Sequence, residues 1–347
     1  MPNTVLTEAI DALASGHDLS ADQAAATLAE IMGGEASEVQ IAGVLVALRA
    51  KGETVAELVG LARTMRAFAT PVRCGREDLV DTAGTGGGRQ TFNVSTTAAL
   101  IAAGAGCAVA KHGNRSATSR SGSADVLESL GVRIDLCPDA IARCIDDVGF
   151  GFMFAPAHHG ATRFVVPVRK ELGVRTVFNF LGPLTNPAGA ARQVIGVSDP
   201  GLLDTVAGAA AELGAVRAIV ACGEDGMDEL STSGATRVVE VDDGQLRSYA
   251  LDPEDVGLHR SALGAVAGGS PADNAETARR IFAGERGPAR DLAVLNAGAA
   301  IYVSGRVDDL EAGVRAAEGA LDSGAVAATL ERLAVLTQEL SEPVQTG

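Results

Sequence analysis

The sequence has no tryptophan, only 3% aromatic residues and comparatively few positive charges. Its 28 Lys and Arg residues stand against 44 Asp and Glu residues, so the formal net charge is −16 at pH 7. This charge argues against nucleic acid and an anionic membrane surface as the main partner, because like charges repel. Aliphatic side chains must form the interior, and 47% hydrophobic residues are enough for a sizeable core.

Cysteine and long apolar runs are also scarce. The five cysteines form no CxxC pair, and their odd number excludes a complete disulfide framework, which favours a reducing cytoplasm. Residues 1–16 contain no basic segment before an apolar run, and no apolar run along the chain is long enough to span a bilayer. We therefore expect a cytoplasmic protein without a signal peptide or a membrane span.

Residues 1–72 have the pattern of a small all-helical domain. Capping-box sequences occur at residues 20–23 (SADQ), 37–40 (SEVQ) and 54–57 (TVAE), each before a run rich in Ala and Leu. Glycines lie where these runs end, as expected at helix C-termini.

From Asp78 onward, predicted strands alternate with predicted helices. This alternation indicates an α/β domain with a largely parallel central sheet covered by helices. The strands are predicted over residues 78–84, 107–111, 133–136, 150–156, 192–198 and 216–223, with an edge hairpin over 237–251. The chain from Asn274 onward is again predicted to be helical.

Two stretches that follow predicted strands have the composition of anion-binding loops. DTAGTGGGRQTFNVST (81–96) has four glycines in five residues before a helix, so backbone N–H groups and the helix N-terminus can face an anion. It matches neither the dinucleotide-binding pattern GxGxxG with a downstream acid nor the P-loop pattern GxxxxGK[ST], so a Rossmann-type site and a P-loop are excluded. KHGNRSATSR (111–120) is basic and rich in Gly, Asn and Ser. Without an anion-binding role, residues 81–96 would form a tight structural turn, and residues 111–120 would form a basic loop exposed to solvent.

Two further stretches carry acidic and basic candidates. GEDGMDELSTSG (223–234) places Asp228 and Glu229 after a strand, and Mg²⁺ is often held by one or two carboxylates together with substrate phosphates. In residues 154–189, arginines at 163, 169 and 175 are predicted to lie on a helix, from which Arg169 would bind a carboxylate. Without these roles, residues 223–234 would form an acidic turn exposed to solvent, and Arg169 would be a surface residue of an amphipathic helix. The adjacent His158 and His159 lack a third metal ligand nearby, which disfavours a metal site there.

Together, and in this order along nearly the whole chain, these motifs resemble the anthranilate phosphoribosyltransferase family. KHGNRS and LGPLTNP in one chain are highly specific to it. The resemblance implies transfer of a phosphoribosyl group from 5-phosphoribosyl diphosphate (PRPP) to the amine of anthranilate in tryptophan biosynthesis. It also implies Mg²⁺ and a homodimer joined through the helical domain. That domain would comprise residues 1–72, rejoined by about 163–188, and the α/β domain would comprise residues 73–162 and 189–347.

The resemblance also implies a set of site residues. The residues expected to bind PRPP are Gly84, Gly87, Gly88, Thr91, Asn93, Val94, Ser95, Thr96, Lys111, His112, Gly113, Asn114, Arg115, Ser116, Ala117, Thr118, Ser119 and Ser123. Those expected to bind anthranilate are Gly84, Asn114, His159, Arg169 and Pro183. Ser95, Asp228 and Glu229 would hold the metal. Lys111, His112 and Arg169 would have catalytic roles.

The glycine-rich loop departs from the family pattern, which is GTGGD with one more residue before TFN. Here the loop reads GTGGGRQTFN, so the acid is missing, the loop is one residue shorter and Arg89 lies in it. Two other functions stay open. One is a nucleoside phosphorylase of the same fold, which would use inorganic phosphate, and the other is a non-catalytic phosphate-binding or regulatory protein.

Overall fold

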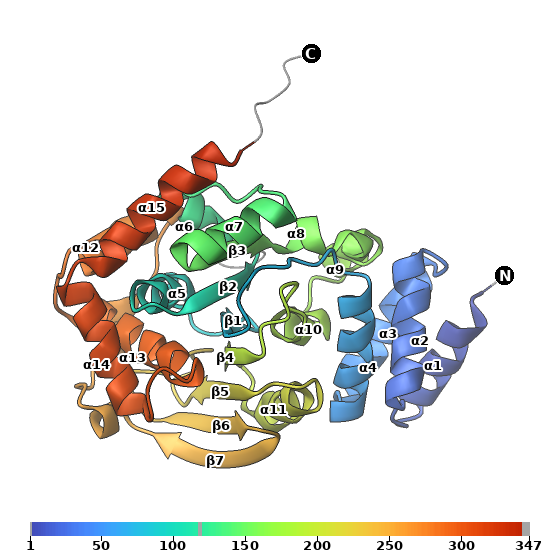
Figure 1. Ribbon diagram of the computed structural model, residues 1–347. Coiled ribbons are helices and arrows are strands. Elements are labelled where there is room, and N and C mark those ends of the chain that lie inside the picture. Colours follow the sequence, from blue (N-terminus) through green and yellow to red (C-terminus); the bar gives the residue numbers. More distant parts are fainter. Residues whose placement is uncertain (1, 117–119, 342–347) are drawn as a thin grey trace.

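Two regions of the chain differ in architecture, as Figure 1 shows for the computed structural model, which describes residues 2–116 and 120–341. The N-terminal region, drawn in blue, is a bundle of helices. They are α1 (Thr4–Ala14), α2 (Ala21–Gly33), α3 (Glu38–Lys51) and α4 (Val55–Ala67). The larger region is an α/β domain, so the predicted fold class is confirmed.

Helices α2, α3 and α4 begin at the predicted caps, with one correction. Ser20 and Thr54 each start a complete capping box, in which two side chains exchange hydrogen bonds with the backbone of the first turn. Ser37 accepts a hydrogen bond from the Gln40 N–H, but the Gln40 side-chain oxygen accepts from the Asn3 N–H instead of closing the box. The third predicted box is therefore only half formed, because Gln40 ties α3 to the start of α1.

The α/β domain is built on one seven-stranded sheet with the order β3-β2-β1-β4-β5-β6-β7. Its strands are β1 (Leu79–Gly84), β2 (Ala108–Gly113), β3 (Phe150–Phe154), β4 (Arg192–Gly196), β5 (Arg217–Gly223), β6 (Thr236–Asp242) and β7 (Gln245–Leu251). Strands β1 to β5 run parallel, whereas β6 and β7 form the predicted antiparallel hairpin at the edge. The strand order reverses between β1 and β4, the position where open α/β sheets form a ligand crevice.

The strand predicted over residues 133–136 is wrong. This segment lies outside the sheet, and the Arg133 N–H donates to the Thr337 hydroxyl at 3.1 Å. The alternation that suggested a strand comes from Val132 and Ile134, which are buried in the core formed with the C-terminal helices.

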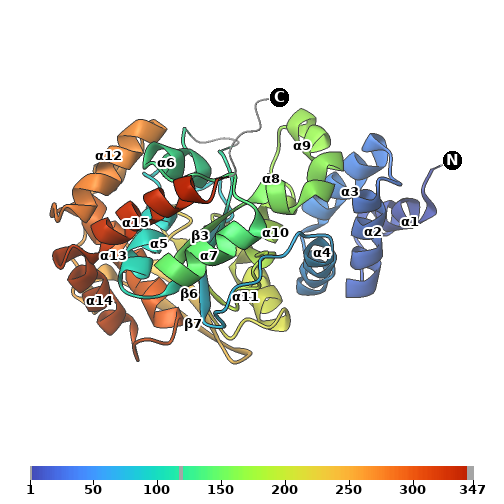
Figure 2. The ribbon, with the colours of Figure 1, turned by 45° about the horizontal axis from the view of Figure 1, so that its top comes forward.

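Helices cover both faces of the sheet (Figures 1 and 2). One face packs against α5 (Val94–Gly104) and α13 (Pro288–Val303), and α14 (Leu310–Asp322) lies against both helices. The opposite face packs against α7 (Pro138–Val148), α10 (Phe178–Leu184) and α11 (Leu203–Glu212). Helix α4 of the bundle lies against α10 and α11, so the apolar core of the bundle continues into this side of the α/β domain.

The arginines at 163, 169 and 175 do not share one helix, which corrects the prediction. Arg163 lies in a 3₁₀ helix (Gly160–Phe164), and Arg169 lies in α9 (Val166–Leu172). Helix α9 ends at Gly173, whose φ of 63° places it in the left-handed region, so Arg175 lies in the following loop. Helix α9 packs against α3 of the bundle (Figure 2).

The remaining helices complete the outer layer. They are α6 (Ser123–Ser129), α8 (Ala155–His158), α12 (Pro271–Phe282) and α15 (Ala325–Glu339), with short 3₁₀ helices at Pro200–Leu202, Pro253–Val256 and Leu263–Val266. Among the helices of residues 2–116 and 120–341, none has both the length and the apolar composition required to cross a bilayer.

Candidate active site

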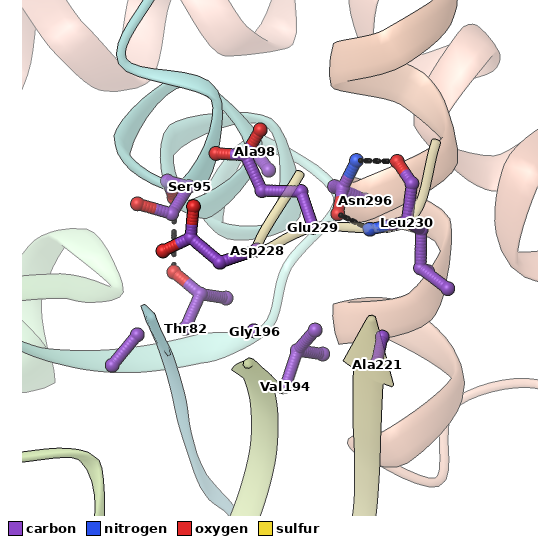
Figure 3. A pocket seen from close by; sticks show the side chains of 11 residues that line it. Thr82, Ser95, Ala98, Val194, Gly196, Ala221, Asp228, Glu229, Leu230 and Asn296 are labelled. Atoms are coloured by element: carbon purple, nitrogen blue, oxygen red, sulfur yellow. Dashed lines mark hydrogen bonds between the residues drawn. The ribbon is translucent and has the colours of Figure 1, made fainter. Parts of the chain in front are cut away.

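The predicted loops meet because they follow parallel strands and therefore lie at one edge of the sheet. The C-terminal parts of β1, β4 and β5, the loop after β5, the first turns of α5 and one residue of α13 enclose a pocket next to the reversal of strand order. Its empty volume is about 310 Å³. The residues that line it are Thr82, Ala83, Ser95, Ala98, Val194, Gly196, Ala221, Asp228, Glu229, Leu230 and Asn296. Figure 3 shows Ser95, Asp228 and Glu229 around this space, so the three expected metal ligands come together.

Asp228 packs directly against the glycine-rich loop. Its Oδ2 accepts a hydrogen bond from the Gly86 N–H at 3.0 Å. A methyl group at Gly84 would lie 2.7 Å from the same oxygen, and one at Gly88 would collide with the other carboxylate oxygen and lie 2.8 Å from the Asp228 backbone nitrogen. Only glycine lets the loop and the carboxylate approach this closely.

Asp228 and Glu229 are half-buried neighbours whose carboxylates do not favour ionisation. Desolvation raises the pKa of Asp228, and desolvation together with the charge of Asp228 raises the pKa of Glu229 well above its usual range. Glu229 accepts a hydrogen bond from the Thr91 hydroxyl at 3.2 Å. A divalent cation between the two carboxylates would relieve this repulsion, so the donor set fits Mg²⁺.

The protein offers few side chains that could coordinate a metal ion at this site. No group of three or more His, Cys, Asp or Glu side chains that could hold a metal ion occurs in the part of the chain that the structure describes. Mg²⁺ characteristically keeps waters or substrate phosphates in its coordination shell, so a site with two carboxylates suits a metal that arrives with an anionic substrate.

Lys111 and His112 project from opposite faces of the sheet because successive residues of a strand alternate. Lys111 is 1% exposed and faces α5, where its Nζ donates to the Thr82 carbonyl at 2.5 Å and lies 3.5 Å from Ser95 Oγ. Desolvation lowers the pKa of Lys111 to about 8, against the opposing effects of Asp81 and Glu229. A cation that is buried and only partly compensated is a favourable place for an anion.

His112 faces α10 on the other side of the sheet. Its Nδ1 lies 3.0 Å from the Gly182 carbonyl, which can only accept, so Nδ1 carries the proton and Nε2 is an acceptor. Burial and the neighbouring His159, whose ring centroid is 5.0 Å away, lower the pKa of His112 to about 3. His112 is therefore neutral at pH 7, and its Nε2 has no partner among the described residues.

The start of α5 is open to an anion. Asn93 is the N-cap residue, but its side chain makes no capping hydrogen bond. Thr96 in the first turn is 1% exposed, and its hydroxyl has no hydrogen-bond partner within the described part of the chain. Buried hydroxyls rarely remain unpaired, so a ligand oxygen at the start of α5 is the expected partner.

The basic loop after β2 is less cationic than its sequence indicates. Arg115 forms ion pairs with Asp125 and Glu128 of α6, both at 2.6 Å. Ser123 Oγ donates to the Asn114 carbonyl at 3.2 Å, which holds the loop against α6. The predicted binding residues Ala117, Thr118 and Ser119 lie outside the described residues.

Arg169 is a half-buried cation without an acidic partner among the described residues. Its guanidinium donates to Asn179 Oδ1 at 3.2 Å and lies 5.5 Å from the centre of the Phe178 ring, while its Nε has no hydrogen-bond partner in the described part of the chain. Desolvation lowers the pKa of Arg169. This environment favours a ligand carboxylate, which a guanidinium binds through two parallel hydrogen bonds.

Pro183 lies in α10 beside Gly182, and the Pro183 carbonyl accepts from Gln193 at 2.6 Å. Helix α10 thus holds Pro183 close to His112, and His159 is buried next to the same ring. The structure therefore places Pro183 and His159 near His112 on one side of the sheet, whereas Gly84 and Asn114, which are also expected to bind the acceptor, lie at the strand ends with the expected metal ligands.

Sequence reasoning missed Asn179 and gave Arg175, although it was noted, no role in the site. Asn179 joins Arg169 to the glycine-rich loop, because its Nδ2 lies 3.4 Å from the Thr85 carbonyl. The Arg175 side chain lies over Gly87 and donates to Ser198 Oγ at 2.6 Å. Both lie within the motif at residues 154–189, but no local spacing signals their contacts. Arg89 was noted in the sequence as a departure from the family pattern. Its side chain contacts the loop after β5, where its Nε donates to the Asp225 carbonyl at 2.5 Å.

Known proteins resemble this chain in both of its regions. Residues 7–69 match the helical bundle domain of the glycosyl transferase family, and residues 76–327 match its α/β domain. An anthranilate phosphoribosyltransferase of Rubrobacter xylanophilus is 53% identical over 339 residues, which cover 97% of this chain and 99% of that protein.

Solved structures give the same result. Anthranilate phosphoribosyltransferase from Thermus thermophilus has a TM-score of 0.90 at 48% identity, with 95% of this chain and 99% of that chain covered. The Saccharomyces cerevisiae enzyme, solved in complex with PRPP and Mg, has a TM-score of 0.88 at 27% identity, with 97% and 99% covered.

Proposed function

The chain belongs to the glycosyl transferase family, among the anthranilate phosphoribosyltransferases, and from this premise we propose how its own residues carry out the reaction. The enzyme transfers the 5-phosphoribosyl group of PRPP to the amine of anthranilate, giving N-(5-phosphoribosyl)anthranilate and pyrophosphate in tryptophan biosynthesis. The bond from C1 of the ribose to pyrophosphate breaks, and a bond from C1 to the amine nitrogen forms.

PRPP binds at the strand ends between the glycine-rich loop and the loop after β2. The observation that carries this proposal is the buried Lys111, which an acidic protein holds beside Ser95 at the start of α5, where the Thr96 hydroxyl has no partner among residues 2–116 and 120–341. Backbone N–H groups of the glycine-rich loop add donors without adding bulk. These groups stabilise the negative charge that develops on the departing pyrophosphate.

Asp228 and Glu229 hold Mg²⁺, and Ser95 adds a hydroxyl oxygen from the start of α5. Mg²⁺ is the metal of this reaction, and when bound it offsets the charge of the pyrophosphate. The raised pKa of both carboxylates means that protons and metal compete for them. Metal binding therefore weakens as the pH falls through the range in which these groups take up protons.

Arg169 binds the carboxylate of anthranilate. Anthranilate is a poor nucleophile because the amine lone pair is delocalised into the ring, so positioning must contribute much of the rate. Asn179 fixes the guanidinium and lies close to the glycine-rich loop, which relates the position of the acceptor to that of PRPP. The free Nε2 acceptor of His112 is placed to take a hydrogen bond from the amine N–H as the new bond forms. No strong base is required for this step.

A homodimer in the cytoplasm is the proposed state of the enzyme. Val39 and Val46 of α3 are 82% and 46% exposed, and their spacing of seven residues places them on one face of the helix. Val166 at the start of α9 and Val174 in the loop after α9 are also exposed, and α9 packs against α3. This apolar surface on the bundle favours pairing with a second copy.

The segment 163–188 is proposed to belong to the bundle because α9 and α10 pack against α3 and α4.

The experiment that tests the function is the loss of anthranilate fluorescence in a mixture of protein, anthranilate, PRPP and Mg²⁺. The signal should fall only when PRPP and a divalent metal are both present. Phosphorolysis of a nucleoside by the same preparation, without loss of anthranilate, would instead favour a nucleoside phosphorylase.

A further inference from the structure

The chain around residues 266–274, far from the phosphate loops in sequence, is in direct contact with one of them. The Phe92 N–H donates to the Val266 carbonyl at 3.3 Å, and Thr91 forms an isolated antiparallel bridge with Ala267. A side chain at Gly268 would collide with the Thr91 carbonyl, so the two backbones touch. The entry to α12 is therefore clamped to the residues that precede α5.

Asn274 in the first turn of α12 fixes the side chain of Asn93. It is 4% exposed, and its Nδ2 donates to Asn93 Oδ1 at 2.8 Å across 181 residues of sequence. Its Oδ1 accepts from the Gly269 N–H at 2.8 Å. That backbone donor settles which end of the Asn274 amide is the oxygen, so its Nδ2 is the group that faces Asn93.

Asn93 in turn holds the far end of the basic loop. Its Oδ1 accepts from Ser121 Oγ at 2.8 Å, and its Nδ2 donates to the Ser121 carbonyl at 3.1 Å. Both ends of the Asn93 amide are therefore used in joining Ser121 and Asn274, which explains why this N-cap residue does not cap its own helix. A second pocket, with an empty volume of about 190 Å³, opens beside this junction and is lined by Thr91, Ser121 and Asn274 among others.

We propose that Asn274 is a positioning residue for PRPP. By holding Asn93 against Ser121, it fixes the start of α5 relative to Ser121 and so keeps the donors in the first turn of α5 aimed at the polyanionic substrate. This inference rests on the proposed function of that site. Arg169 and its contacts lie in the segment 159–184, with which Asn274 shares no described hydrogen bond, so the acceptor should be unaffected.

The test compares Michaelis constants for the two substrates in three variants of the full chain. Asn274→Ala removes both hydrogen bonds, whereas Asn274→Asp keeps the shape and the acceptor for Gly269 but loses the donor to Asn93. Thr277→Ala is the matched control on α12, since its hydroxyl bonds only within that helix. Loss of one or two neutral hydrogen bonds should raise KM for PRPP roughly 5- to 30-fold. KM for anthranilate and both constants in Thr277→Ala should stay within about twofold of the wild type.

Melting temperatures with and without PRPP separate positioning from simple stabilisation. A positioning role predicts that Asn274→Asp loses much of the stabilisation that PRPP gives to the wild-type protein. Equal increases in both Michaelis constants, an unchanged KM for PRPP, or failure of both Asn274 variants to fold would overturn the proposal. Absence of PRPP-dependent anthranilate consumption in the wild type is a separate result, and it would count against the proposed function itself.

Discussion

Replacing Gly88 by Ala should weaken metal use, although residue 88 is not itself a proposed metal ligand. The backbone of Gly88 is not in the left-handed region, so alanine adds no backbone strain. Its methyl group would instead collide with the Asp228 carboxylate and lie 2.8 Å from the Asp228 backbone nitrogen. The carboxylate is the mobile partner in this collision, and its displacement breaks the 3.0 Å hydrogen bond from the Gly86 N–H.

The size of the effect follows from that hydrogen bond. A hydrogen bond to a charged group contributes about 1.5–3 kcal/mol, so misplacing Asp228 should raise the Mg²⁺ concentration for half-maximal activity roughly 10- to 100-fold. The assay is anthranilate consumption against Mg²⁺ concentration at saturating PRPP. Gly234→Ala is the matched control, because this glycine follows the same acidic loop, has an ordinary φ and would place its methyl group in open space.

Gly88→Asp adds a carboxylate to the same steric change, so the difference between the Asp and Ala variants isolates the effect of charge at this position. The Asp variant should bind PRPP in EDTA more weakly than Gly88→Ala, because the added carboxylate repels the diphosphate. An unchanged Mg²⁺ requirement in Gly88→Ala would refute the argument that close approach of this loop positions Asp228.

The remaining predictions concern charge and assembly. Arg169→Ala should weaken anthranilate use by about 10- to 100-fold with PRPP binding unchanged, because one desolvated charged hydrogen-bonding group is lost; equal losses for both substrates would make Arg169 structural. Asp228→Asn and Glu229→Gln should each raise the Mg²⁺ requirement, and a titration unchanged in both would exclude a metal role. KM for PRPP should rise as the pH increases through about 8, where Lys111 loses its proton. The same titration should not destabilise the fold, because the pKa of Lys111 is lowered by folding and its deprotonation favours the folded state; a parallel fall in melting temperature would contradict this. Val46→Asp should convert the proposed dimer to monomer in light scattering, since it places a charge on the exposed face of α3.

Much of the fold could be predicted because it depends on local patterns. Helices α2, α3 and α4 begin where a Ser or Thr side chain can pair with the backbone three residues later, and this signal is contained within one turn. The alternation of strands and helices after Asp78 requires parallel strands, and parallel strands bring their following loops to one edge. The meeting of the glycine-rich loop, the basic loop and the acidic loop was therefore contained in the order of the motifs.

Errors arose where a local pattern had a non-local cause. Val132 and Ile134 alternate like a strand, but they are buried under C-terminal helices rather than paired in the sheet. The sequence predicts Arg163, Arg169 and Arg175 on one helix, but Arg163 lies in the preceding 3₁₀ helix and Gly173 ends α9 before Arg175. Arg115 reads as a free cation in its basic stretch, yet α6 folds back and supplies two carboxylates.

The sequence by itself determined the fold class and the loops that follow the strands, because caps, turns and strand periodicity act within a few residues. The family was indicated by the resemblance of motifs such as KHGNRS and LGPLTNP. Only the tertiary structure decided how those loops are held. The Asn93 to Asn274 hydrogen bond spans 181 residues, and the contact of Asp228 with Gly86 spans 142. Such pairs depend on strand order and on which helices cover which face, and no spacing along the chain records them. The same holds for the neutral state of His112, which results from burial against α10 and His159 rather than from its neighbours in sequence.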